Sequence, residues 1–284
     1  MRTLLFLCCL AALWQCQSNT NKTNPPTAAA DLTEMVKTTH AEARDTLLAD
    51  TTAPLKAIAL QPLVRDTAWK ELAGLKLGEL FVVSWPDNGF YGDERRRIEF
   101  ILTSVERSFN DPFVYAVKGK NRYKTTISDF EGLIEIKEVA RFTDPNLNTE
   151  YVEDMNVQKN YALSGEFRFD EDRSLSTSGQ FMGTFKMDIG VSKDREPSLW
   201  FFSKGTPADG CGYRFDGTWT SYTKPDLKRT VIWSRDLFSF ANDILSEFSY
   251  GERDVEINPK YRNLGWDTFW EGEEWWHEGG KKEM

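Results

Sequence analysis

The chain has 284 residues, of which 40% are hydrophobic and 13% aromatic, enough to bury a sizeable core. Its formal net charge of -9 argues against nucleic acid or an anionic membrane as an electrostatic partner, because the sequence has no basic patch that could release counterions. Length alone allows two domains, but one all-β body with a tether fits equally well.

The N-terminus has the composition of a secretory signal peptide, predicted here for residues 1–15. Arg2 precedes an apolar run at residues 4–14 that is too short to cross a bilayer as a helix. The stretch Leu13-Trp14-Gln15-Cys16 resembles the lipobox of bacterial lipoproteins. That resemblance implies that Cys16 is diacylated through its sulfur and becomes the mature N-terminus. Because Trp14 and Gln15 depart from the small residues usual in this motif, a plain secretory leader cleaved nearby is the alternative.

Residues 16–70 are predicted to be the lipidated cysteine followed by a flexible tether and connector. The residues after Cys16 are polar and contain prolines, a composition that cannot form a core. In the lipoproteins, an aspartate directly after the cysteine often marks retention in the inner membrane, and Gln17 stands there instead. The resemblance therefore implies an outer-membrane lipoprotein of the bacterial cell envelope, facing the periplasm or the cell surface.

Residues 71–270 are predicted to form a single mainly β domain: an antiparallel barrel or two-layer sandwich of about ten strands, with one C-terminal amphipathic helix. Apolar and polar residues alternate most clearly at residues 161–169 and 181–189, the period of a half-buried strand. The apolar run at residues 79–84 is predicted to be the first strand, and residues 85–89 the turn after it. Apolar residues at three-and-four spacing over residues 237–248 predict the helix.

A short pattern of phenylalanine, any residue and glycine occurs three times, with its glycines at Gly132, Gly183 and Gly217. On a strand, the residues two positions apart share one face, so each glycine is expected between bulky side chains. We expect either that an aromatic ring from a neighbouring strand fills the space that each glycine leaves, or that the glycine permits a bend in a strongly coiled sheet. The unequal spacing of the copies argues against a propeller or a solenoid.

Polar and reactive residues of the body give few signs of chemistry. Residues 94–97 are a charge run expected in solvent, as is the acidic triplet at residues 170–172, and Cys211 is expected to be a buried, inert thiol. Neither His40 nor His277 has a metal-ligand spacing, and no nucleotide-binding or nucleophile motif is present. The sequence therefore predicts no cofactor and no metal, and leaves open whether the protein is an enzyme, leaning against it.

The C-terminal region, including an acidic aromatic tail at residues 271–284, holds the candidate binding residues. These are Trp266, Trp270, Glu274, Trp275, Trp276 and His277. Exposed tryptophans beside carboxylates can stack on sugar rings while the acids accept hydroxyl protons. Alternatively, the first two tryptophans close the core while the last two lie against the body or reach the membrane interface.

A second resemblance covers about the last quarter of the chain. The stretch Gly217-Thr218-Trp219-Thr220-Ser221-Tyr222, with Asn258-Pro259-Lys260-Tyr261 and Gly265-Trp266, resembles the closing part of a group of uncharacterised bacterial envelope lipoproteins. It implies no catalytic residues. We therefore expect a lipid-anchored envelope protein with a non-enzymatic binding or interaction role, whose partners are the membrane, through its anchor, and an envelope protein or glycan. The alternative is a glycan-acting or glycan-binding protein that uses exposed tryptophans and paired carboxylates.

Overall fold

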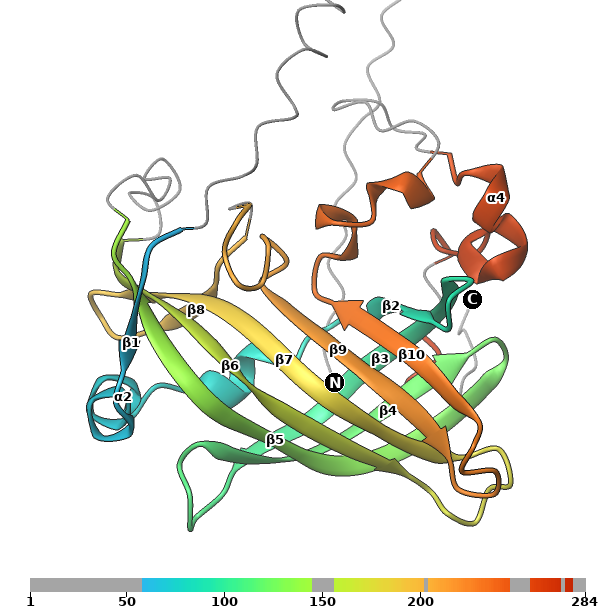
Figure 1. Cartoon of the computed structure of the whole chain (residues 1–284), viewed down its shortest axis with the longest axis horizontal. Coiled ribbons are helices and arrows are strands. Elements are labelled where there is room, and N and C mark those ends of the chain that lie inside the picture. Colours follow the sequence, from blue (N-terminus) through green and yellow to red (C-terminus); the bar gives the residue numbers. More distant parts are fainter. Residues whose placement is uncertain (1–57, 145–155, 202–203, 246–255, 272–273, 278–284) are drawn as a thin grey trace, which may run out of the picture. The chain divides into compact units, whose positions relative to one another are not determined.

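The structure is a computed structural model that describes residues 58–144, 156–201, 204–245, 256–271 and 274–277 (Figure 1). The expected signal peptide, Cys16 and most of the expected tether lie outside these residues. Within them the chain is mainly β, with ten strands in one antiparallel sheet, as predicted. No helix in the part of the chain that the structure describes is long and apolar enough to cross a membrane.

The elements follow one another in the order β1, α2, η1, β2 to β10, η2, η3, α4 and η4, where η marks short helical turns. Their bounds are β1 Leu60–Leu63, α2 Arg65–Leu72, η1 Leu77–Leu80, β2 Asp87–Tyr91, β3 Arg96–Arg107, β4 Val114–Tyr123, β5 Thr126–Phe142, β6 Val157–Glu171, β7 Gly179–Ser192, β8 Pro197–Leu199, β9 Tyr213–Ser221, β10 Lys228–Ser234, η2 Leu237–Ser239, η3 Asn242–Ile244, α4 Pro259–Tyr261 and η4 Arg262–Trp266.

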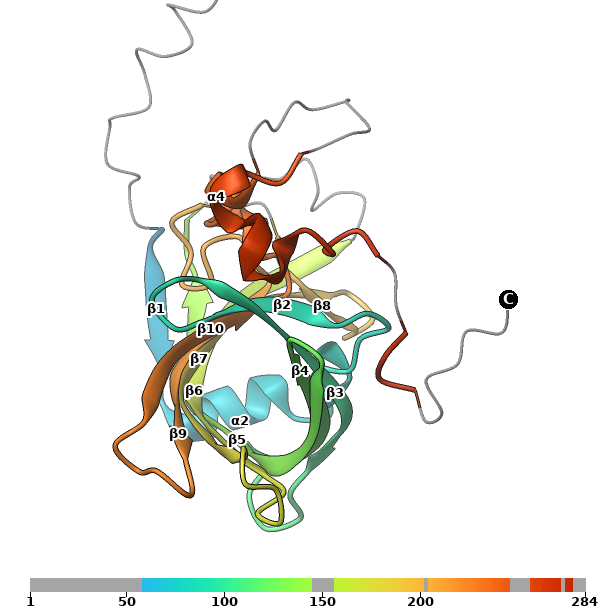
Figure 2. The same cartoon turned by 90° about the vertical axis from the view of Figure 1, so that its right-hand side faces the viewer.

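Eight of the strands close into a barrel. From β2 to β7, and then through β9 to β10, each strand pairs with the next, and β10 pairs back with β2. Figure 2 looks into this ring. The closing contact runs from Val231 opposite Tyr91 to Ser234 opposite Asn88. The fold is therefore an up-and-down antiparallel barrel rather than a two-layer sandwich.

Aromatic side chains fill the barrel interior. Trp233 of β10 lies between two rings: its centroid is 4.1 Å from that of Phe100 and 4.6 Å from that of Phe215, with both pairs stacked. The residues predicted to share the inward face of β6 and β7 are buried there, namely Tyr161, Leu163, Phe167, Phe169, Phe181, Phe185, Met187 and Ile189. A small barrel packed in this way has a solid core.

Two of the patterned glycines lie directly opposite each other on neighbouring strands of the barrel. Gly183 of β7 pairs with Gly217 of β9, and Phe167 lies opposite Gly183 on β6. A Cβ atom on Gly217 would lie 2.8 Å from the Phe167 ring and 2.5 Å from the Met182 carbonyl oxygen. The Phe167 ring therefore occupies the space beside Gly217, as the sequence pattern predicts, whereas a Cβ on Gly183 or Gly132 would meet backbone atoms of the neighbouring strand.

One end of the barrel is closed by the chain that precedes β2. Phe81, which follows η1, is buried against Phe185, Tyr213 and Phe215. The expected strand at residues 79–84 is therefore wrong: Leu80 ends the turn η1, Phe81 closes the barrel and Val82 is exposed. The first strand of the ring is β2, which begins inside the expected turn. Gly89 lets β2 lie close against β10, since a Cβ there would lie 2.6 Å from the Cβ of Trp233.

Two other features differ from the sequence-based predictions. Residues 58–70, expected in the connector, contain β1, which pairs with β5, and most of α2. Leu237 to Leu245 forms the two turns η2 and η3 in place of a continuous helix, because the backbone leaves helical geometry at Phe240 and Ala241, and Leu245 then forms an extended bridge with Ile257. Leu237 and Ile244 are nevertheless buried, on the outside of the barrel.

Two charged segments expected in solvent are partly buried. Arg97 of the basic run is buried and ion-paired with Glu99, because the C-terminal segment covers the outer face of β3. Glu171 of the acidic triplet is buried and accepts hydrogen bonds from the side chains of Asn121 and Trp219 and from the Gly179 backbone N–H, at 2.8, 2.9 and 2.7 Å. Three donors to one carboxylate explain why it tolerates burial.

Candidate functional site

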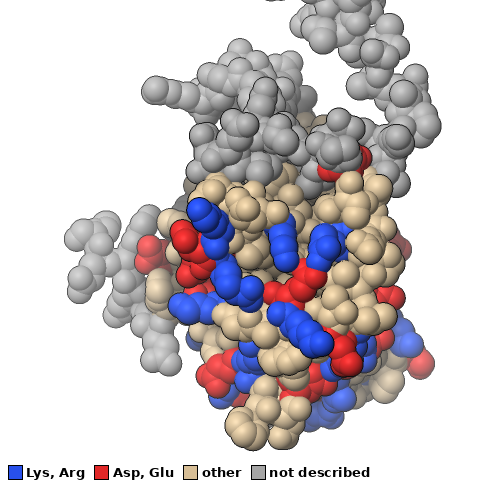
Figure 3. Space-filling view, turned by 90° about the vertical axis from the view of Figure 1, so that its left-hand side faces the viewer, with Lys and Arg blue, Asp and Glu red and all other residues tan. Residues whose placement is uncertain are grey.

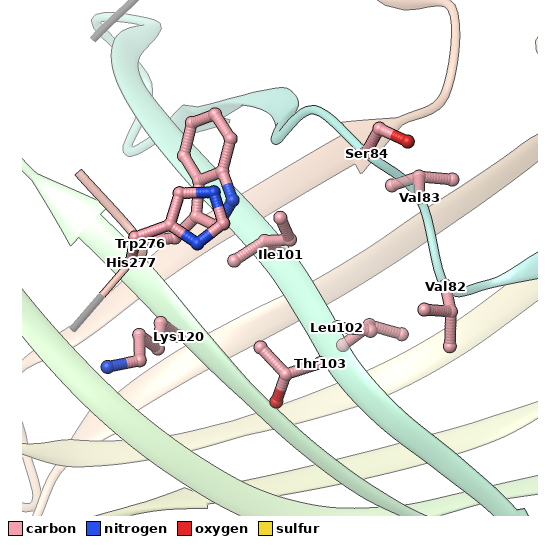
Figure 4. A pocket seen from close by; sticks show the side chains of 9 residues that line it. All are labelled: Val82, Val83, Ser84, Ile101, Leu102, Thr103, Lys120, Trp276 and His277. Atoms are coloured by element: carbon pink, nitrogen blue, oxygen red, sulfur yellow. The ribbon is translucent and has the colours of Figure 1, made fainter. Parts of the chain in front are cut away.

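A groove lies on the outside of the barrel, next to the N-terminal end of β2, where β3 extends further than β2 does. On its β3 side, β2 covers only residues Arg96 to Phe100. Strand β3 continues from there to Arg107, paired among the described strands with β4 alone. Beyond the end of β2, a groove of about 630 Å³ is lined by three consecutive residues on either side of it, Val82 to Ser84 and Ile101 to Thr103, together with residues of β4 and the tail. Figure 4 shows these two short stretches facing each other.

The lining of the groove combines apolar and polar side chains. The apolar ones are Val82, Val83, Ile101, Leu102 and Trp276, and the polar ones are Ser84, Thr103, Lys120 and His277. Two hydroxyls, an ammonium group and an imidazole thus surround a largely hydrocarbon surface. Such a mixture can bind a ligand that has an apolar face and hydrogen-bonding edges.

A β-bulge shapes the floor of the groove. The register between β3 and β4 shifts between Leu102 and Ser104, leaving Thr103 as the extra residue. Its hydroxyl donates a hydrogen bond to the Lys118 carbonyl oxygen at 3.2 Å. Bulges re-aim side chains. Here Ile101, Leu102 and Thr103 all line the groove, although Leu102 also belongs to the barrel core.

Residues 274–277, close to the C-terminus, form a further wall of the groove. Trp275 and Trp276 pack on Ile101 of β3, and each is only 8% exposed. The Trp275 indole N–H donates to Oε1 of Glu99 at 3.4 Å, and the Arg122 guanidinium lies over the Trp275 ring at 5.3 Å. These contacts hold residues 274–277 against the outer face of β3 and β4.

Glu99 is the centre of a buried ion network under this wall. Its Oε1 accepts a hydrogen bond from Arg97 at 2.9 Å and its Oε2 one from Arg122 at 2.6 Å. Arg97 also donates to Asn88 at 2.7 Å and to Thr268 at 3.3 Å. One carboxylate between two guanidinium groups thus joins β2, β3, β4 and the C-terminal segment.

Trp85 is a candidate residue that sequence reasoning missed, since it was assigned to a turn. It is 52% exposed and meets Trp276 edge-on, with ring centroids 5.7 Å apart. His277 stands on the other side of Trp276, at 5.3 Å between centroids, and its Nε2 lies 3.8 Å from a carboxylate oxygen of Glu274. Trp85 follows Ser84 directly, so its exposed ring borders the groove.

Of the six candidate residues, four lie in or beside this groove, one is buried in the core and one is exposed elsewhere. Trp276 and His277 line the groove, with Glu274 and Trp275 beside them. Trp266 is fully buried, and its indole N–H donates to the Arg95 carbonyl oxygen at 2.8 Å. Trp270 is 59% exposed but packs edge-on against Phe269, outside the groove lining. The tail therefore offers no continuous row of exposed indole faces.

Other buried acidic groups serve the fold. Asp87 accepts hydrogen bonds from Tyr213 at 2.6 Å and Arg235 at 2.9 Å, and burial raises the pKa of its carboxyl to about 7. Asp188 accepts one from the Ala208 backbone N–H at 3.0 Å, and burial raises its pKa to about 6. Among the residues described, no group of three or more His, Cys, Asp or Glu side chains is placed to hold a metal ion.

Comparison with protein-family models, with curated proteins and with solved structures gave no match in any of the three searches.

Proposed function

We propose that this chain is a lipid-anchored protein of the bacterial cell envelope with a non-enzymatic binding role, and that the outer groove is its binding surface. The observation that carries the choice of site is the contrast between two spaces. Aromatic side chains fill the barrel interior, whereas the groove beside Trp276 holds about 630 Å³ of open volume. A ligand of this barrel therefore binds on its outside.

The composition of the groove favours a saccharide as its ligand. A sugar ring has one face of C–H groups, which packs against an indole, and hydroxyls around its edge. Trp85 supplies an exposed aromatic ring, while Ser84, Thr103 and Lys120 supply hydroxyl and ammonium groups. This supports the glycan-binding form of the expectation drawn from the sequence, with a different tryptophan as the stacking residue.

Calorimetric titration of the full mature chain tests the groove. The probes are soluble disaccharide-peptide fragments of peptidoglycan and neutral hexose oligomers. Val82→Arg places a charged side chain in the groove from an already exposed position, and should weaken binding by about tenfold or more, which corresponds to about 1.4 kcal/mol. Met182→Arg, at an exposed position outside the groove lining, is its matched control and should bind normally.

Trp85→Ala and Trp270→Ala form a second matched pair, since both indoles are exposed but only the first contacts Trp276. Loss of saccharide binding in Trp85→Ala alone is the expected result. If no saccharide binds to the wild-type chain, the saccharide assignment is overturned. If Val82→Arg binds saccharide as the wild type does, the assignment of the binding site to this groove is overturned. Mass spectrometry of the mature N-terminus tests the anchor separately, by the mass of the acyl groups on Cys16.

A further inference from the structure

Large apolar side chains are exposed at the end of the barrel that carries α2. Val64, the residue before α2, is 73% exposed, and Phe109, in the hairpin between β3 and β4, is fully exposed. Trp69 of α2 is exposed as well. The largest of these, Phe109 and Trp69, lie at one end of the domain, and exposed apolar side chains that gather in this way can form an interaction surface.

The helix and the hairpin are held together as one unit. Arg65 of α2 donates to both carboxylate oxygens of Asp111, at 2.8 and 2.7 Å, and its guanidinium lies 4.6 Å from the centroid of the Phe113 ring. Trp69 meets the same ring edge-on at 6.2 Å. Since Ala68 and Leu72 face the core, α2 presents Trp69 outward, next to the hairpin that carries Phe109.

The chain enters the described domain at this same end. Strand β1 pairs with the last residues of β5, from Leu63 opposite Val139 to Leu60 opposite Phe142. Figure 1 shows β1 beside α2, at the left of the barrel. The chain thus enters the described domain through β1, which leads directly into Val64 and α2.

The charges at this end suit a zwitterionic or mixed headgroup layer. Figure 3 looks onto this side and shows Lys and Arg side chains gathered there, with Asp and Glu among them. The acid nearest the helix end is already paired, because Glu71 accepts from Arg141 and Tyr161. Electrostatic attraction is not the driving force in a chain of net charge -9, so association would depend on apolar insertion helped by an acyl anchor.

We propose that the α2 end, defined by Val64, Trp69 and Phe109, is a membrane-docking face that rests in the interface of the bilayer to which Cys16 is anchored. The inference rests on the lipid anchoring given under the proposed function. Phe109 and Val64 enter the interfacial layer, while the Trp69 indole lies at headgroup level, where an amphipathic ring is stable. Docking at this end turns the opposite end, with the hairpin between β6 and β7, away from the membrane.

The test uses the full lipidated chain in vesicles of phosphatidylethanolamine and phosphatidylglycerol, with one environment-sensitive fluorophore. It is attached in Phe109→Cys or Val64→Cys, and in the matched control Leu175→Cys, an exposed apolar position in the hairpin between β6 and β7. The native thiol Cys211 is buried and does not take the label. The expected result is a blue-shifted emission, quenched by brominated lipid, at the first two positions and neither change at the third.

Equal emission and equal quenching at all three positions would overturn the docking face. Mass spectrometry of the same sample separates this failure from that of the anchor. If Cys16 is acylated and the labels at positions 64 and 109 stay in water, only the docking face is wrong. If Cys16 carries no lipid, the anchor fails; the chain with Cys16→Ser, labelled at the same positions, is then mixed with excess vesicles, and absence of a blue shift there overturns the docking face as well.

Discussion

The indole N–H of Trp275 donates a hydrogen bond to Oε1 of Glu99 at 3.4 Å, so a residue near the end of the chain contacts an ion network on β3. Glu99 is the carboxylate shared by Arg97 and Arg122, and all three side chains are largely buried. Glu99→Gln leaves two guanidinium groups without their counterion, and should lower the free energy of unfolding by about 3 kcal/mol.

Urea unfolding followed by tryptophan fluorescence measures this loss. The matched control is Glu131→Gln, since Glu131 is an exposed partner of Lys118, and its effect should stay within about 0.5 kcal/mol. Equal midpoints for the two variants would show that the network does not stabilise the fold. In the Glu99 variant, residues 274–277 should also become more sensitive to limited proteolysis, because their contact on β3 is weakened.

Gly183→Val and Gly217→Val should each destabilise the barrel. A side chain at Gly217 would meet the Phe167 ring at 2.8 Å and the Met182 carbonyl at 2.5 Å, and one at Gly183 would meet the backbone of β9. Overpacking of this kind costs about 1–3 kcal/mol or more, and the melting temperature should fall by several degrees. Thr218→Val, on the outer face of the same strand, should melt like wild type; if the glycine variants do too, the wall is not closely packed there.

Asp188 should make stability depend on pH. Burial raises the pKa of its carboxyl from 3.8 to about 6, so the folded chain holds more protons than the unfolded one between these values. The contribution of Asp188 to the free energy of unfolding should therefore be greatest below about pH 4. It should fall as the pH rises through about 6 and stay level at higher pH. The fall is at most about 3 kcal/mol, from about 1.4 kcal/mol per pKa unit.

Asp188→Asn should remove this component while keeping an acceptor for the Ala208 backbone N–H. Asp87 titrates at higher pH, with a pKa of about 7, so the measurement is the difference between wild type and variant across the range. A constant difference from about pH 4 to about pH 8 would contradict the prediction.

Cys211 should be unreactive in the folded protein. The thiol is buried and burial raises its pKa to about 12, so almost no thiolate is present at neutral pH. Titration with a thiol reagent should find no reactive group in the native mature chain if Cys16 is acylated, and one after denaturation in urea. A reactive group in the native chain is assigned by peptide mapping: at Cys16 it contradicts acylation, and at Cys211 it contradicts burial.

Much of the β architecture could be predicted because a barrel interior imposes a period of two on every strand that lines it. The alternation at residues 161–169 and 181–189 follows directly from that constraint. Whether the sheet closes could not be predicted, since it depends on the pairing of β10 with β2, far apart in the chain. Strand β2 was missed because Asp87, Asn88 and Gly89 have turn chemistry, which Asp87 instead uses to bind Tyr213 and Arg235.

The candidate site was predictable only in part. Trp276 and His277 were candidates because aromatic and acidic residues gather in the tail, and both line the groove. Val82 and Trp85 carried no such signal, because the groove exists only where β2 stops short of β3. The burial of Trp266 and Trp275 depends on tertiary partners, Arg95 and Glu99, that no local pattern reveals.

The pairing of β10 with β2 also sets an order of events during biosynthesis. Every other contact in the ring joins strands that follow one another in the ring's chain order, so those hairpins can form as the chain emerges. Closure of the ring needs all residues up to Ser234, because β2 has no other described strand to pair with on that edge. Until then β2 keeps an unpaired edge, which is open to pairing with another chain. Under the export proposed above, the polypeptide would need holding factors, or rapid translocation, until its last ring strand has crossed.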